Sequence, residues 1–329
     1  MAATGKTVRI AHLSDLHFLS TWPVMAQSLL GLAALVGGGR LLAGLFRKLP
    51  PRARLPATLA LPLLAGLAAM VYSNRARRVF AFIQEAVWLA SHARPRRLEL
   101  VMERLDELEV DHLVVTGDLT TTSRASEFRE AFELLHRWGW EGERLTVVAG
   151  NHDRLSDHRE NSLEAHYRGQ KLLRRVAPGV WLAALDSCRQ PKQQRDIVDA
   201  LLANCGGRIE DGQLTRLRRR LDGFDDGSLV VALHHPVWAA RPSPAGGLGL
   251  MKRVQRDFWG PAEGSDELLE IISTLHGTVL CGHVHPQWPL RIRSTAARLF
   301  CGTASGLTPG FGMLEIKPGK RVRYRQVKV

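Results

Sequence analysis

Five short blocks of residues that can bind a metal ion recur along the chain, and each follows a short apolar run. They are rich in carboxylate and imidazole groups, which hold divalent cations in proteins. The blocks read Asp15-Leu16-His17, Gly117-Asp118, Gly150-Asn151-His152-Asp153, His234-His235 and Gly282-His283-Val284-His285. If the five blocks meet in space, they predict a metal centre and the hydrolytic chemistry that such a centre supports.

The apolar runs before these blocks are typical of buried β-strands, because they are short and rich in β-branched residues. They cover residues 8–11, 113–115, 145–148, 229–233 and 278–281. In open α/β sheets, ligands bind beyond the carboxyl ends of the strands, so five strand ends can place their side chains around one point. Helical spacing of apolar residues predicts helices over residues 98–108, 126–138 and 213–221, the second with Ser126 as its N-cap.

In this order, the patterns D-x-H, GD, GNHD, HH and GHxH resemble the calcineurin-like metallophosphoesterases, and most closely their bacterial class III phosphodiesterase-like branch. The resemblance covers residues 7–18 and, after a gap, residues 78–329. It implies an α/β fold, a layered sandwich of two mixed β-sheets flanked by helices. Residues 1–18 and 78–329 would form the metallophosphoesterase domain, and residues 19–77 would form an inserted helical apolar hairpin.

The same resemblance implies two divalent metal ions, of manganese, iron or zinc, held close together. Asp118 would bridge both ions, and the remaining ligands would be Asp15, His17 and His285 for the first ion and Asn151, His234 and His283 for the second. The spacing of the HH pair leaves open which histidine binds metal. The resemblance favours His234, which leaves His235 near the substrate.

A two-metal site serves phosphoester hydrolysis in two ways. It lowers the pKa of a bridging water, which gives a metal-bound hydroxide near neutral pH, and it clamps the phosphoryl oxygens during in-line attack. His152 is the candidate that gives the leaving group a proton or a positive neighbour, and Asp153 is placed to orient the His152 ring. Gly117 allows backbone and metal to approach closely beside Asp118. We therefore expect a metal-dependent phosphodiesterase or phosphatase.

The composition of the whole chain limits its location and partners. The 329 residues carry a formal net charge of +13, which favours anionic partners such as phosphorylated substrates, acidic lipids or nucleic acid. The four cysteines form no CxxC pair, as expected in a reducing compartment. The first residues contain no apolar stretch of the kind found in a cleavable signal peptide, so we expect a cytoplasmic protein.

The gap in the resemblance contains two apolar stretches, residues 24–46 and 55–72, in which Arg40 is the only charge. Both approach the length of a membrane span, but the basic segment between them, residues 47–54, would have to cross the membrane. A shallow hairpin with its basic residues at the lipid headgroups fits better, which predicts a peripheral or monotopic protein on the cytoplasmic face. The alternative is a buried helical pair packed on the catalytic domain, for example within a dimer.

Three functions are compatible with these features. The first is hydrolysis of an amphiphilic, possibly lipid-linked, phosphoester or pyrophosphate at a membrane surface, since the apolar insertion begins a few residues after His17. UDP-2,3-diacylglucosamine is one such substrate, although its usual hydrolases carry GNRD where this chain has GNHD. The second is a phosphodiesterase for soluble cyclic nucleotides or glycerophosphodiesters that the insertion merely anchors. The third is a nucleic-acid-binding or scaffold protein, but the chain has no specific nucleic-acid motif.

Overall fold

The structure is a computed structural model of the full chain. It describes residues 6–18, 95–156, 158–169, 171–189, 206–224, 227–238, 260–273, 275, 277–284, 290–293, 298–302, 310–317 and 322–329. The predicted hairpin and His285 lie outside these residues, so both remain sequence-based predictions. Among the described residues, no helix combines the length and the apolar character that crossing a membrane requires.

The first sheet contains five strands in the order β11-β10-β1-β2-β3. Its parallel strands are β1 (Val8–Leu13), β2 (His112–Thr116) and β3 (Leu145–Val148), with Ile10 opposite His112 and Leu113 opposite Leu145. Antiparallel strands β10 (Gly310–Ile316) and β11 (Arg323–Lys328) complete the sheet beside β1. The sheet is therefore mixed, and the carboxyl ends of its three parallel strands lie at one edge.

The second sheet contains six strands in the order β4-β5-β6-β7-β9-β8. Four of them are parallel: β5 (Val180–Ala184), β6 (Ser228–Ala232), β7 (Thr278–Cys281) and β9 (Arg298–Cys301). The edge strands β4 (Leu173–Ala177) and β8 (Leu290–Arg293) run antiparallel to their neighbours. This sheet supplies a second row of parallel strand ends.

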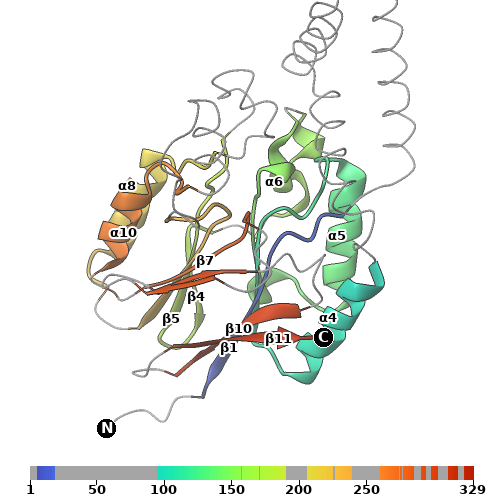
Figure 1. Ribbon diagram of the computed structural model, residues 1–329, viewed down its shortest axis with the longest axis horizontal. Helices are drawn as coiled ribbons and strands as arrows, with labels where there is room; N and C mark the ends of the chain where they lie inside the picture. The colour runs from blue at the N-terminus through green and yellow to red at the C-terminus, as the bar shows by residue number, and fades with distance from the viewer. Residues whose placement is uncertain are drawn as a thin grey trace, which may run out of the picture.

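Helices cover the two sheets on their outer faces (Figure 1). Helices α4 (Pro95–Glu107) and α5 (Ala125–Arg137) pack on the first sheet in an apolar cluster that includes Leu13, Met102 and Phe128. Helices α8 (Asp211–Leu221) and α10 (Ser265–Ser273) pack on the second sheet. A third cluster joins residues from both sheets, among them Ile10 and Leu182. The chain thus forms a four-layered sandwich, as predicted.

Alternation along the strands explains this layering. In β1, Val8 and Ile10 belong to the cluster between the sheets, whereas Ala11 and Leu13 face the helices. Both faces of the strand are buried, which is why the sequence reads as a nearly continuous apolar run. Short helical segments occupy the loops: η1 (Gly142–Arg144), η2 (His152–Arg154), η3 (Arg159–Asn161) and α6 (Leu163–His166).

All five predicted strands are confirmed, as β1, β2, β3, β6 and β7. The helices predicted over residues 98–108, 126–138 and 213–221 are α4, α5 and α8. The prediction that Ser126 caps α5 is wrong. The helix begins at Ala125 with Arg124 as its N-cap residue, and the Glu127 carboxylate accepts the Arg124 N–H at 3.4 Å.

Candidate metal centre

The five strand ends bring buried ligand atoms together, as the sequence predicts. Ligand atoms of Asp15, Asp118 and His234 all lie within 4.8 Å of one another, and so do ligand atoms of His234, His235 and His283. Asp15 and Asp118 follow strands of the first sheet, whereas His234 and His283 follow strands of the second. The cluster therefore lies where the carboxyl ends of the two sheets meet.

The backbone at this cluster adopts a conformation that non-glycine residues rarely adopt. Asp15 (φ 53°), His17 (φ 50°), Asp118 (φ 50°) and His283 (φ 71°) all lie in the left-handed region. Each such residue costs on the order of 1–3 kcal/mol and persists only where its surroundings enforce it, most often at functional sites. All four were predicted as metal ligands from the sequence, so the strain coincides with the predicted chemistry.

Backbone hydrogen bonds enforce these conformations. The N–H of Asp15 donates to the Gly117 carbonyl at 3.0 Å, the N–H of His17 to the Asp118 carbonyl at 2.9 Å, and the N–H of Phe18 to the Leu119 carbonyl at 2.7 Å. The first two blocks are thereby joined residue by residue. Their side chains cannot move apart without breaking this ladder.

Two glycines are required sterically. At Gly117 (φ 90°) a Cβ would lie 2.6 Å from the Gly150 nitrogen and 2.6 Å from His234 Nδ1. At Gly150 a Cβ would lie 2.0 Å from Asp118 Oδ1. The GD and GNHD motifs therefore begin with glycine because their loops pass each other in direct contact, which confirms the close approach predicted beside Asp118.

The ring of His234 is oriented so that one nitrogen faces the cluster. Its Nδ1–H donates to the Thr116 carbonyl at 2.8 Å, so Nε2 faces Asn151 Oδ1 at 3.0 Å and Asp118 Oδ2 at 3.4 Å. Nδ1 of His283 also lies 3.0 Å from Asn151 Oδ1. When the His234 ring is neutral, its Nε2 and the oxygens of Asn151 and Asp118 all present electron pairs to one another. Their proximity is then favourable only if a proton or a metal cation lies between them.

The electrostatics of the cluster show the same demand for positive charge. Burial alone would raise the pKa of Asp118, but the imidazoles of His234, His152 and His17 outweigh it and hold that pKa well below its usual range. Burial lowers the pKa of His234, and the Asp118 carboxylate more than reverses this effect and raises it to about 9. Carboxylate, amide oxygen and imidazole nitrogen suit Mn, Fe or Zn, so the residues present fit a metal centre.

Among the described residues, His17 is the remaining predicted ligand, and it lies farther from Asp118 than His234 does. His17 Nε2 lies 4.0 Å from Asp118 Oδ2, with its side chain fully buried. His17 also contacts the ring of His152 edge to face, at 5.0 Å between ring centroids. It therefore borders the carboxylate predicted to bridge the two metals, on the side nearer to His152.

The prediction that Asp153 orients the His152 ring is wrong. His152 Nδ1 instead donates to the Thr121 carbonyl at 2.9 Å. Asp153 accepts four hydrogen bonds, from the N–H groups of Gly150, Leu119 and Thr120 and from the Thr120 hydroxyl, at 2.8–3.2 Å. Its carboxylate ties the GNHD loop to the loop that follows Asp118, and burial together with Asp118 raises its pKa to about 6.

His235 belongs to the second group of ligand atoms and is buried. Its ring packs against that of His283, at 4.5 Å between centroids, and its Nδ1 lies 3.0 Å from the Ser187 hydroxyl. Burial, followed by the neighbouring His283 and His234, holds the pKa of His235 well below its usual value. A positive charge on this ring is therefore disfavoured.

Two residues at the site were missed from the sequence. Ser187 contacts both histidines of the HH block, and Arg154, buried beside the GNHD loop, forms ion pairs with Asp186 at 2.8 Å and with Glu164. The signal was present, because residues 185–187 read Leu-Asp-Ser directly after the apolar strand β5. This sixth strand end has the same form as the five that were recognised.

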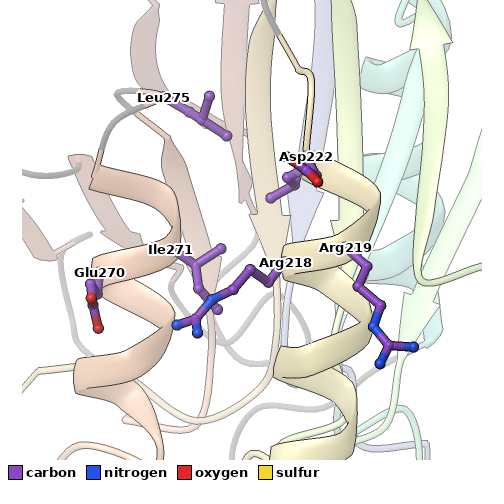
Figure 2. Close-up of a pocket in the computed structure, with 7 residues that line it drawn as sticks. Arg218, Arg219, Asp222, Glu270, Ile271 and Leu275 are labelled. Carbon is purple, nitrogen blue, oxygen red and sulfur yellow. The ribbon is translucent and has the colours of Figure 1, made fainter.

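A separate hollow of 540 Å³ lies between α8 and α10. It is lined by Arg218, Arg219, Leu221, Asp222, Glu270, Ile271 and Leu275, none of which belongs to the metal cluster. Figure 2 shows Arg218 reaching from α8 toward α10, where it pairs with Glu267 at 3.5 Å. This hollow is lined by an ordinary mixture of apolar stems and exposed charges, so it is not a part of the candidate site.

The chain matches one known protein family and is similar to several solved structures. The family model described as calcineurin-like phosphoesterase matches residues 8–287. No curated protein sequence matches the chain. Among solved structures, the sulfate thiohydrolase SoxB of Thermus thermophilus in complex with glycerol is similar with a TM-score of 0.48 and 12% identity, over 98% of this chain and 56% of that one.

Two further structures are similar. A Staphylococcus aureus protein described as a 5'-nucleotidase, in complex with alpha-ketoglutarate, has a TM-score of 0.41 and 13% identity, over 70% of this chain and 48% of that one. GAP50, the anchor in the inner membrane complex of Plasmodium, has a TM-score of 0.48 and 9% identity, over 98% of this chain and 85% of that one. The chain spans about half the length of the first two of these structures.

Proposed function

Because the chain belongs to the calcineurin-like phosphoesterases, we propose that it is a metal-dependent phosphoester hydrolase. Its substrate would be an amphiphilic phosphoester or pyrophosphate at a membrane surface, hydrolysed with two metal ions. One observation carries the catalytic part of this proposal. Buried ligand atoms from both sheets converge within 4.8 Å, on backbone held in a strained conformation. His17 and His285 complete the proposed set of ligands, the latter on sequence grounds alone.

The roles of the residues follow from their contacts. Asp15, Asp118, Asn151, His234 and His283 would hold the metal ions, which when bound would activate water and neutralise the charge on the phosphoryl group. His152 is fixed by its Nδ1–H bond to the Thr121 carbonyl, which directs Nε2 away from that loop. A protonated Nε2 can then donate to the leaving oxygen as it acquires negative charge.

The membrane part of the proposal rests on the position of the residue from which the chain enters the insertion. Phe18, the last described residue before residue 95, pairs with Thr120, and its carbonyl accepts the Thr121 N–H at 3.0 Å. The last described residue before the apolar and basic stretch therefore lies against the loop that holds Asp118. An insertion that begins at this point would present acyl chains or an anionic headgroup to the metal ions.

A second candidate is a phosphodiesterase for soluble cyclic nucleotides or glycerophosphodiesters. The observation that favours it is the intact GNHD motif, in which His152 is buried and oriented by the Thr121 carbonyl. In this case the insertion anchors the protein without contacting substrate, and catalysis is indifferent to lipid.

The experiment compares three substrates with the manganese-loaded protein: bis-p-nitrophenyl phosphate, cyclic AMP and UDP-2,3-diacylglucosamine. Each is assayed with and without vesicles containing anionic phosphatidylglycerol. The proposal expects the lipid substrate to be preferred and vesicles to stimulate its hydrolysis. Preference for cyclic AMP, unaffected by vesicles, supports the soluble alternative, and single-stranded DNA binding that survives loss of the metal ligands supports a nucleic-acid role.

Variants separate the insertion from the general charge of the protein. The full chain with Arg47, Lys48 and Arg52 replaced by glutamine should bind anionic vesicles more weakly, because each basic residue contributes about 1 kcal/mol near a charged surface. The matched control replaces Arg218, Arg219 and Arg220, exposed on α8, by glutamine. Equal vesicle binding by both variants and the unmodified chain would overturn the membrane proposal.

The variant His152→Ala tests whether His152 is the general acid that protonates the leaving group. Turnover should fall by about 10²-fold or more while two metal ions remain bound, because His152 approaches the leaving group and not the metals. Loss of metal in His152→Ala would show that the residue is a ligand instead.

A further inference from the structure

We propose that Ser187 fixes His235 as a neutral Nε2–H hydrogen-bond donor aimed at a phosphoryl oxygen, so that His235 is not a metal ligand. This inference rests on the proposed phosphoester hydrolysis, which supplies the anionic oxygen. It assigns opposite tasks to two adjacent histidines whose spacing in the sequence does not distinguish them.

The hydrogen-bonding capacity of the Ser187 hydroxyl carries the argument. A serine hydroxyl can accept two hydrogen bonds and donate one. Its oxygen accepts the backbone N–H of His234 at 3.2 Å and the backbone N–H of His235 at 3.0 Å, and these two donors fill both acceptor positions. The remaining contact, at 3.0 Å to His235 Nδ1, must therefore use the hydroxyl proton.

This donation determines the tautomer of His235. Because Nδ1 accepts the hydroxyl proton, it carries none of its own, and in the neutral ring the proton lies on Nε2. A ring rotated by 180° would place a carbon against the Ser187 oxygen and lose the bond. The contact with Ser187 thus selects one tautomer and one ring orientation together.

His234 has the opposite arrangement. Its Nδ1 faces a backbone carbonyl, that of Thr116 at 2.8 Å, which only accepts hydrogen bonds. Nδ1 of His234 must carry the proton, and the Nε2 electron pair is available for a metal ion. The carbonyl behind one ring and the saturated hydroxyl behind the other therefore decide which histidine of the pair binds metal.

The Nε2–H of His235 is buried and has no hydrogen-bond partner within the described part of the chain. A buried donor left unsatisfied costs about 1–3 kcal/mol, so its retention in this position calls for an acceptor. The ring contacts His283 and has a nitrogen within 4.8 Å of ligand atoms of His234 and His283. An oxygen of a phosphoester held by the second metal ion would supply the acceptor.

The chemical consequence is stabilisation of charge without proton transfer. A fixed N–H donor strengthens its hydrogen bond as negative charge accumulates on the phosphoryl oxygen in the transition state. Ser187 acts through His235 and is a positioning residue. His235 itself would contact the substrate.

The test is nitrogen NMR of the zinc-loaded protein labelled with ¹⁵N-histidine, with the His235 signals assigned by their loss in His235→Gln. We expect the Nε2–H tautomer and no zinc-bound nitrogen for His235, and a zinc-bound Nε2 for His234. In Ser187→Ala the His235 signals should shift toward the other tautomer. A purely structural role of Ser187 would leave the tautomer unchanged.

Two further readouts use substitutions at His235 itself. Glutamine can place an N–H donor near the position of Nε2, whereas phenylalanine cannot. Both variants should retain two zinc ions per chain, and His235→Phe should lose on the order of 10²-fold in kcat, with partial recovery in His235→Gln. Inorganic phosphate should bind more weakly to His235→Phe than to His235→Gln.

A zinc-bound His235, an Nδ1–H tautomer, or loss of one zinc ion in His235→Gln would each overturn the inference. These outcomes do not depend on turnover. A wild-type protein that binds two zinc ions but hydrolyses no phosphoester would contradict the proposed function, and the tautomer, zinc content and phosphate affinity would still decide the role of His235.

Discussion

Replacing Asp153 by asparagine tests whether this carboxylate holds the site together or serves His152. One oxygen of Asp153 accepts the Thr120 N–H and hydroxyl, at 2.9 and 2.8 Å, and the other accepts the N–H groups of Leu119 and Gly150, at 3.2 and 3.0 Å. An asparagine side chain has one acceptor oxygen, so its NH₂ group must face two of these donors. If the NH₂ group faces Leu119 and Gly150, two buried N–H donors lose their acceptor. If it faces Thr120, the hydroxyl can turn to accept from it, and only the Thr120 N–H loses its acceptor.

The expected cost follows from that count. Each buried donor left without an acceptor costs about 1–3 kcal/mol, so one or two such donors destabilise the protein by about 1–6 kcal/mol. Relief of the repulsion between Asp153 and Asp118 brings the expected value toward the lower end of this range. Since domains are stable by about 5–15 kcal/mol, Asp153→Asn should remain folded at 25 °C but lose a large part of its stability.

The assay is urea unfolding of Asp153→Asn and wild type, with manganese affinity measured on the same samples. Thr120→Val is the matched control, because it removes only the hydroxyl from the four donors and should cost about 1 kcal/mol. We expect lower stability and weaker manganese binding in Asp153→Asn, since Asp118 and Asn151 lie on the two loops that the carboxylate joins. Unchanged stability and metal affinity with reduced turnover would refute this reasoning and restore the role of Asp153 in orienting His152.

Two other predictions concern the site and the core. Gly150→Ala should abolish metal binding, because the new Cβ would lie 2.0 Å from Asp118 Oδ1, whereas Gly223→Ala, with no atom within 4 Å, should leave manganese affinity unchanged. His112 is buried, and burial followed by Arg174 lowers its pKa to about 4, so the unfolded chain binds a proton first as the pH falls below about 6.5. Protonation of this group therefore removes up to about 3 kcal/mol of stability between pH 6.5 and pH 4. The free energy of unfolding of His112→Gln, measured with urea, should depend correspondingly less on pH over this range.

The fold and the position of the metal cluster could be predicted because each depends on local signals. Buried strands such as residues 145–148 are short apolar runs, and the residue that follows each strand is placed at the sheet edge by chain geometry alone. Where ligand residues follow five such strands, their convergence does not depend on the details of packing. That is why Asp118 Oδ2 and His234 Nε2 lie 3.4 Å apart, although the two residues are far apart in the sequence.

The partners of the site residues could not be predicted in the same way. Whether His152 bonds to Asp153 or to the Thr121 carbonyl depends on how the loops pass each other, which is set by tertiary contacts and not by spacing. Because His152 and Asp153 are adjacent in the sequence, Asp153 was wrongly predicted to orient His152. Ser187 was missed for a related reason, because serine gives no metal-ligand signal although it lies at a strand end of the same form.

The local start of α5 shows the same limit. Ser126 is a residue type that favours the N-cap position, but the helix begins one residue earlier because the Glu127 carboxylate also accepts the N–H and hydroxyl of Thr122, at 2.9 and 2.6 Å. This contact fixes the loop after Asp118 against the helix. The contacts that hold this loop therefore determine where the helix begins, and they outweigh the preference of Ser126 for the N-cap position.

Electron paramagnetic resonance of the manganese-loaded protein tests the central claim most directly, because it reports whether two ions share a bridging ligand. The claim of a dinuclear centre predicts two manganese ions per chain with a spin-coupled spectrum, and an uncoupled spectrum in Asp118→Asn. A single uncoupled ion in the wild-type protein, with full phosphodiester hydrolysis, would contradict it.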